Sequence, residues 1–169
     1  MKLLITDVKK AVTGELLAAL YRCADAAIRA EGILGMVAAS LIFVNDAEIR
    51  DLNRKHRGIN CSTDVLSFPN IVYPDGKTAA SCPELLMQAY DDAADSVFLG
   101  DIVISTEHAE AQAKEYGHSV IREYAYLLTH GLFHLMGYDH LTDEDRAVMR
   151  SMEEKALSDA GIWRETDNG

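Results

Sequence analysis

The stretch LLTHGLFHLMGYDH, residues 127–140, holds three of the chain's six histidines and indicates a metal site. On an α-helix, residues four apart lie on one face, so the imidazoles of His130 and His134 can point to one place. Gly137 suits the left-handed turn that ends many helices, and such a turn can bring His140 back to that place. Three imidazoles with one open position are typical of catalytic zinc sites, whereas structural zinc sites usually have four protein ligands.

We therefore predict that His130, His134 and His140 bind one zinc ion per chain. Nickel, copper and iron also accept imidazole ligands, so the pattern favours zinc without excluding them. The alternative is that the three histidines are unrelated residues near a helix end, where positive charge complements the helix dipole.

The same spacing occurs in the metzincin protease signature, HExxHxxGxxH. The glutamate of that signature is the general base of peptide hydrolysis, and Gly131 stands at its position in this chain. A glycine cannot accept a proton, which argues against a peptidase. A zinc metalloprotease-like hydrolase nevertheless stays as an alternative function.

Length and composition predict one globular domain. The 169 residues suffice for a substantial core, and we expect a single metal-dependent hydrolase domain over residues 1–169. No apolar run reaches the length of a membrane span, and Asp7 interrupts the first apolar stretch, which reads as a strand and not as a signal peptide. Cys23, Cys61 and Cys82 are widely spaced and odd in number, which favours a reducing cytoplasm.

The order of strand-like and helix-like stretches predicts an α/β (α+β) fold, with a small four-stranded mixed sheet packed against about five to six helices. The predicted strands are residues 3–8, 40–45, 65–68 and 98–105. Helices are predicted between residues 13 and 32, 45 and 58, 105 and 117, 119 and 137, and 142 and 161. Residues 70–97 are predicted to be irregular apart from one short helix around 83–89. The metal site therefore lies on a late helix.

Positive charge in this acidic chain gathers at one predicted helix end. The net charge of −11 is unfavourable for RNA binding, which depends on neutralising phosphates with lysine and arginine. Arg50, Arg54, Lys55 and Arg57 form the densest cationic group. They either lie at a solvated helix end and complement its dipole, or Arg57 binds phosphate with its planar guanidinium.

The histidine motif HGLFHLMGYDH closely resembles that of the YbeY family, bacterial rRNA maturation factors and metal-dependent endoribonucleases. The segment LNRKHRGINCSTDVLSFP, residues 52–69, is similar to the family's LNxxxRxxDxPTDVLSFP, and LGDIVIS, residues 99–105, is similar to a family strand. Motif matching extends the resemblance over about residues 40–155. Asn60 and Ser62 depart from the family pattern, and the segment 70–97 looks longer than usual.

This resemblance implies a four-stranded mixed sheet and a functionally important arginine at Arg57. It also implies a single-strand-specific, zinc-dependent endoribonuclease of the cytoplasm, with roles in 16S rRNA 3′-end maturation and ribosome quality control. The implied partners are rRNA and the ribosome or ribosomal proteins. A non-catalytic ribosome assembly factor with a structural metal is a further alternative.

The expected mechanism is attack of metal-activated water on an RNA phosphodiester, with Arg57 neutralising the charge that develops. Attack by the 2′-hydroxyl of RNA stays open as the other route. Asp64 and Asp101 could hold the ligand histidines in place, or they could cap strand ends, and we favour the structural role.

Overall fold

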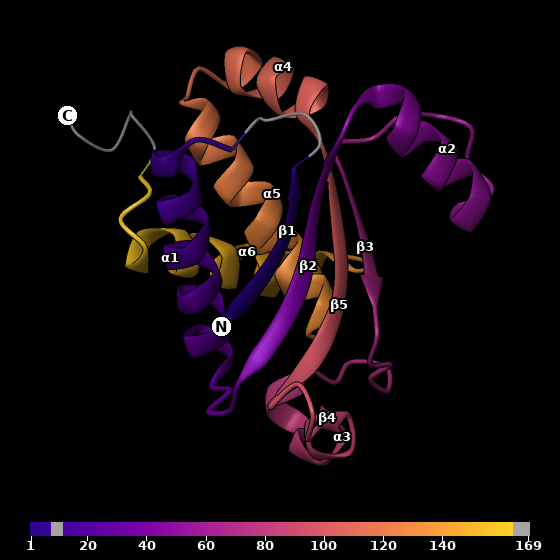
Figure 1. The fold of residues 1–169 in the computed structure, drawn as a ribbon, viewed down its shortest axis with the longest axis vertical. Coiled ribbons are helices and arrows are strands. Elements are labelled where there is room, and N and C mark those ends of the chain that lie inside the picture. Colours follow the sequence, from indigo (N-terminus) through magenta and orange to yellow (C-terminus); the bar gives the residue numbers. More distant parts are fainter. Residues whose placement is uncertain (8–11, 164–169) are drawn as a thin grey trace.

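The computed structural model describes residues 1–7 and 12–163 and shows helices packed around a mixed β-sheet (Figure 1). The strands are β1 (Lys2–Asp7), β2 (Val37–Val44), β3 (Val65–Pro69), β4 (Tyr90–Asp91) and β5 (Ser96–Ser105). The helices are α1 (Gly14–Glu31), α2 (Asp46–Arg57), α3 (Pro83–Gln88), α4 (Thr106–Tyr116), α5 (Val120–Leu135) and α6 (Asp143–Asp159), with a 3₁₀ turn at Ala79–Ser81. The predicted fold class is confirmed. Val8, in the first predicted strand, lies outside the described residues.

The sheet has the strand order β1-β2-β5-β3, and the two-residue β4 pairs with the beginning of β5. Strands β1, β2 and β5 are parallel, whereas β3 and β4 run antiparallel to β5. The four long strands match the predicted ones, and β4 is a fifth strand that the sequence did not indicate. Because β5 has partners on both sides, it is buried along most of its length.

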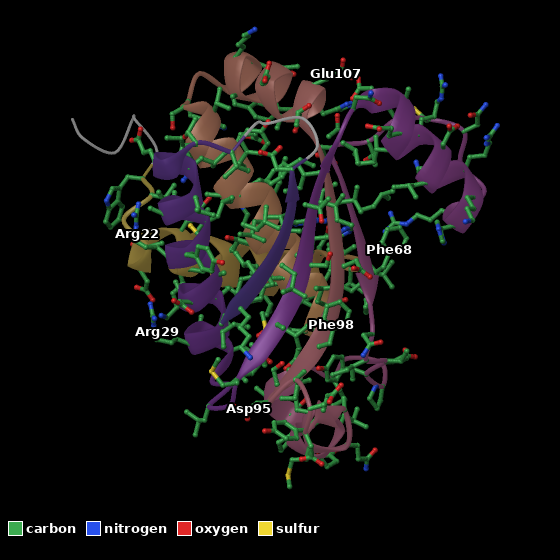
Figure 2. All side chains as sticks on the ribbon, viewed as in Figure 1. Arg22, Arg29, Phe68, Asp95, Phe98 and Glu107 are labelled. Atoms are coloured by element: carbon green, nitrogen blue, oxygen red, sulfur yellow. The ribbon has the colours of Figure 1, made fainter. Side chains whose placement is uncertain are left out.

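The two faces of β5 are covered by different helices. Ile102 and Ile104 belong to the main core, which they share with α1, α5 and α6. Val103 points the other way and packs in a smaller cluster with Ile49 of α2. Phe68 of β3 also lies between the sheet and α2, with its ring 5.0 Å from that of His56 (Figure 2). Residue alternation along one strand therefore places α2 and α5 on opposite faces of the sheet.

Polar caps begin the long helices where the sequence predicts them. The side chains of Thr13, Asn45, Ser105, Ser119 and Thr142 each accept a hydrogen bond from a backbone N–H in the first turn of a helix. These bonds satisfy donors that have no partner inside the helix. None of the helices among residues 1–7 and 12–163 is both long and apolar enough to cross a membrane.

The segment between β3 and β5 fastens the end of α5 to the rest of the molecule. The backbone N–H of Ala79 donates to the carbonyl of Met136 at 2.9 Å, and that of Ala80 donates to the carboxylate of Glu31 at 2.6 Å. The predicted short helix is present as α3. This segment is therefore built into the core region beside the histidine motif, a role that its sequence did not indicate.

Gly131 lies where α5 packs on β5. A Cβ at this position would come 2.9 Å from Cγ2 of Ile102, which is fully buried. Any side chain at position 131 would therefore lie closer to the sheet than van der Waals contact allows, and a glutamate there would collide with β5. Close packing against Ile102 thus explains why the metzincin glutamate is absent at this position, and its absence removes the general base of peptide hydrolysis.

We predict that Gly131→Ala lowers the free energy of unfolding by about 1 kcal/mol. Overpacking costs about 1–3 kcal/mol, and the better helix propensity of alanine returns at most about 1 kcal/mol. Urea unfolding measures this difference. Gly14→Ala, at an exposed helix start with no atom within 4 Å of the new Cβ, is the control and should not lose stability. Equal stability of Gly131→Ala and the unaltered protein would contradict the close packing.

Candidate metal centre

A Schellman turn ends α5 and reverses the chain after His134. Gly137 has a φ of 93°, in the left-handed region that glycine adopts without strain. Its N–H donates to the carbonyl of His134 at 3.1 Å. The N–H of Tyr138 donates to the carbonyl of Phe133 at 3.0 Å. The rings of Phe133 and Tyr138 pack edge to face, 5.1 Å apart. The predicted glycine turn is confirmed, and it brings His140 back beside the helix.

The turn is also held from outside by the segment that follows β3. A Cβ on Gly137 would lie 2.7 Å from the carbonyl oxygen of Lys77 and 2.8 Å from the ring of Tyr73. Backbone conformation and packing therefore both require glycine at this position.

The three histidines of the motif converge on one point. One ring nitrogen from each of His130, His134 and His140 lies within 4.8 Å of the others, a group that can hold a metal ion. The Nε2 atoms of His130 and His134 are 3.1 Å apart. The ring of His140 lies 5.8 Å from that of His130 and 5.0 Å from that of His134.

Hydrogen bonds fix the orientation of two of these imidazoles. Nδ1 of His130 lies 2.7 Å from a carboxylate oxygen of Glu153, and Nδ1 of His134 lies 2.9 Å from the carbonyl oxygen of Tyr138. A carboxylate and a carbonyl oxygen both accept hydrogen bonds, so Nδ1 is the donor in each ring and Nε2 is the nitrogen that faces the site.

This arrangement fits a bound metal. The Nε2 atoms of His130 and His134 face each other at 3.1 Å, so both can bind the same cation. In a tetrahedral site with Zn–N bonds of about 2.0–2.1 Å, ligand nitrogens lie about 3.3 Å apart. Burial, reinforced by the neighbouring His130, lowers the pKa of His134 to about 4, so this ring is neutral and able to bind a metal at neutral pH.

Buried carboxylates from two other helices support the histidines. Glu153 of α6 is 4% exposed and holds His130. Glu31 at the end of α1 is also 4% exposed, and it accepts a hydrogen bond of 2.6 Å from the hydroxyl of Tyr138, whose carbonyl holds His134. Burial and the hydrogen bond to Glu31 raise the pKa of Tyr138, which stays protonated.

Sequence reasoning did not find these supporting residues. Asp64 instead accepts hydrogen bonds from Thr63, from the backbone N–H of Val65 and from Gln112, which agrees with the favoured structural role. In the described part of the chain, the Nδ1 partners of the two half-buried imidazoles, His130 and His134, are Glu153 and Tyr138. Neither Asp64 nor Asp101 is such a partner. Glu153 stands beside Glu154 in the sequence, and nothing there distinguishes the two.

The predicted phosphate-binding residue lies in the same cleft as the histidines. Arg57 is the last residue of α2 and is exposed. It lines a cleft of about 1070 Å³ that also contains His130, His134 and His140, and that we call the Arg57 cleft. Residues from α2 and from the end of α5 are thus brought to one hollow of the surface, although they are far apart in the chain.

A mixed α/β fold with three convergent histidines and an arginine in one cleft defines a candidate metal-dependent hydrolase. The family model described as Endoribonuclease YbeY matches residues 5–161. The chain is 46% identical to Endoribonuclease YbeY of Clostridium acetobutylicum over 142 residues, 83% of this chain and 85% of that protein. It is 44% identical to that of Pelotomaculum thermopropionicum, over 92% of this chain and 93% of that protein. The chain belongs to the YbeY family, as its motifs predicted.

A solved structure has the same fold. The solution structure of a Thermotoga maritima protein superposes with a TM-score of 0.55 at 24% identity, over 92% of this chain and 89% of that one. At this identity the likeness concerns the fold alone.

We predict that Glu153→Gln lowers zinc affinity by about tenfold or more, because an amide is a weaker acceptor for the Nδ1 proton of His130. The substitution keeps the size of the side chain, so the thermal transition should move little. Competition with a chromophoric chelator measures the affinity. Glu144→Gln, at an exposed position on the same helix, is the control and should bind zinc normally. Unchanged affinity of Glu153→Gln would contradict the supporting role.

Proposed function

We propose that this protein is a zinc-dependent, single-strand-specific endoribonuclease. The observation that carries the proposal is the Arg57 cleft, in which three convergent imidazoles and one exposed arginine face the same space. The relatives named Endoribonuclease YbeY support RNA as the substrate, because they match most of the chain.

The residues divide the chemistry between them. His130, His134 and His140 would hold the metal, and a metal held by three imidazoles supplies a bound water whose pKa falls toward neutrality. Gly131 offers no proton acceptor, and the proposed reaction does not need one at that position. The guanidinium of Arg57 would donate two hydrogen bonds to the non-bridging phosphate oxygens, where negative charge increases in the transition state.

The proposed biological role is 16S rRNA 3′-end maturation and ribosome quality control in the cytoplasm. The family to which the chain belongs supports this role. The acidic surface of a chain with net charge −11 suits contact with basic ribosomal proteins. The close packing of Gly131 on Ile102 argues against the metalloprotease alternative, because the protease base has no room there.

We predict that His130→Ala, His134→Ala and the triple alanine variant lose zinc and RNA cleavage together. Removing an imidazole leaves too few ligands for a stable catalytic site. Elemental analysis gives the zinc content, and a fluorescent single-stranded RNA gives the rate. His56→Ala, which alters an exposed histidine of α2, is the control and should keep both. Stoichiometric zinc in the triple variant would refute the site.

We predict that Arg57→Ala keeps zinc and lowers kcat/KM for RNA by about a hundredfold, the usual cost of losing one charged donor to the transition state. Arg50→Ala removes an equal charge from the same helix but outside the cleft, and it should lower kcat/KM far less. Initial rates at equal zinc loading make the comparison. Undiminished cleavage by Arg57→Ala would reject its role in catalysis.

A further inference from the structure

A second cleft meets the first at the three-histidine group. It has a volume of about 860 Å³, and we call it the Arg150 cleft. Asp64, His130 and His140 line both clefts, whereas the rest of this second wall comes mainly from α4, α5, α6 and the turn after α4. The metal-binding group therefore lies where two hollows join and not at the bottom of one pocket.

The carboxylates that line the Arg150 cleft are already engaged. Glu123 lies 3.0 Å from Nε2 of His118, and burial raises its pKa to about 7, so this carboxyl is only about half ionised at neutral pH. Glu153 holds His130, and Asp64 accepts from Gln112 at 3.1 Å. A further lining carboxylate, that of Glu154, lies 3.6 Å from the guanidinium of Arg122. The ion pair with Arg122 offsets the charge of Glu154, whereas the hydrogen bonds to Glu153 and Asp64 occupy acceptor oxygens without removing charge.

Two arginines of α6 add positive charge to the same cleft. Arg146 and Arg150 are four residues apart, so they lie on one face of the helix. Arg146 makes only a solvent-exposed pair with Asp143, a kind of contact that contributes little. Arg150 is exposed and has no ion pair in the part of the chain that the structure describes. Both guanidinium groups can therefore turn to a bound anion.

The same cleft also has an aromatic wall. Tyr116, at the end of α4, is 60% exposed, and Tyr126 of α5 is half-buried. Exposed aromatic rings beside cationic side chains are the combination with which proteins bind single-stranded nucleic acid, since bases stack on the rings and phosphates contact the cations.

The Arg57 cleft has a different character. Its rim carries exposed apolar side chains, among them Val72 at 86% and Leu141 at 79% exposure. Asp75, Asp139 and Asp145 also line it, and Arg57 is the one arginine or lysine among the described residues of its lining. This cleft suits bases better than a run of phosphates, so it cannot by itself hold an extended RNA backbone.

We propose that the Arg150 cleft binds the RNA nucleotides on one side of the scissile phosphate, while the Arg57 cleft binds those on the other side. Arg150 contacts a backbone phosphate and Tyr116 stacks on a base. The inference rests on the proposed endoribonuclease function and deepens it. An endonuclease cuts inside a chain, so its substrate must leave the metal centre in two directions, and two clefts that join at the histidines give it both paths.

The test uses the zinc-loaded protein and a set of single-stranded RNAs with one cleavage site. The RNAs are shortened stepwise from either end. Arg150→Glu is compared with Arg29→Glu, which makes the same change of charge at an exposed position of α1 outside both clefts (Figure 2). Both positions are exposed, so both variants should fold, and zinc content is measured for each.

For Arg150→Glu we expect kcat/KM to fall by about tenfold or more on RNA that is long on both sides of the cut. Its dependence on salt should weaken by about one phosphate contact. The loss should disappear for RNA shortened on one particular side, and Tyr116→Ala should show the same side dependence. Arg29→Glu should cleave every RNA like the unaltered protein.

An equal effect of Arg150→Glu and Arg29→Glu would overturn the assignment of the cleft, as would a loss that is the same for all RNA lengths. If the unaltered protein cleaves RNA and either result is found, only this assignment fails and the proposed function stands. If the unaltered zinc-loaded protein cleaves none of the RNAs, the proposed function and the assignment fail together.

Discussion

Two hydrogen bonds at the Nδ1 atoms of His130 and His134 are the constraint on which the site depends. One goes to the buried carboxylate of Glu153 and the other to the carbonyl of Tyr138. Because both groups accept a hydrogen bond from Nδ1, the Nε2 atoms are the ones that face each other across 3.1 Å. Hydrogen bonds of this kind orient ligand imidazoles in metal sites, so the folded protein is arranged in advance for a metal.

Several elements of the fold meet at these two bonds. Glu153 requires α6 to pack against α5, and the carbonyl of Tyr138 requires the Schellman turn at Gly137. Glu31 of α1 accepts hydrogen bonds from the hydroxyl of Tyr138 and from the backbone N–H of Ala80. It thereby joins the segment after β3 to the turn that follows α5. The core between α1, α5, α6 and the sheet therefore stabilises the fold and orients the histidines at the same time.

The sequence predicted the parts of the site that depend on local geometry. The spacing of His130 and His134 places them on one helix face, and Gly137 signals the turn that returns His140. It did not predict Glu153 or Glu31, because a buried glutamate that supports a ligand looks like any other helical glutamate until its helix is packed. The two-residue β4 and the tethering role of the segment after β3 were missed because that segment has no hydrophobic periodicity. The family motifs, and not charge or periodicity, singled out Arg57.

The central claim is that three imidazoles hold one zinc ion and leave one position open to water. X-ray absorption at the zinc edge of the loaded protein tests it most directly. We predict one zinc per chain, with about three imidazole nitrogens at about 2.0–2.1 Å and one further light ligand. A sulfur ligand, a closed set of four protein ligands, or less than one zinc per chain after loading would contradict it.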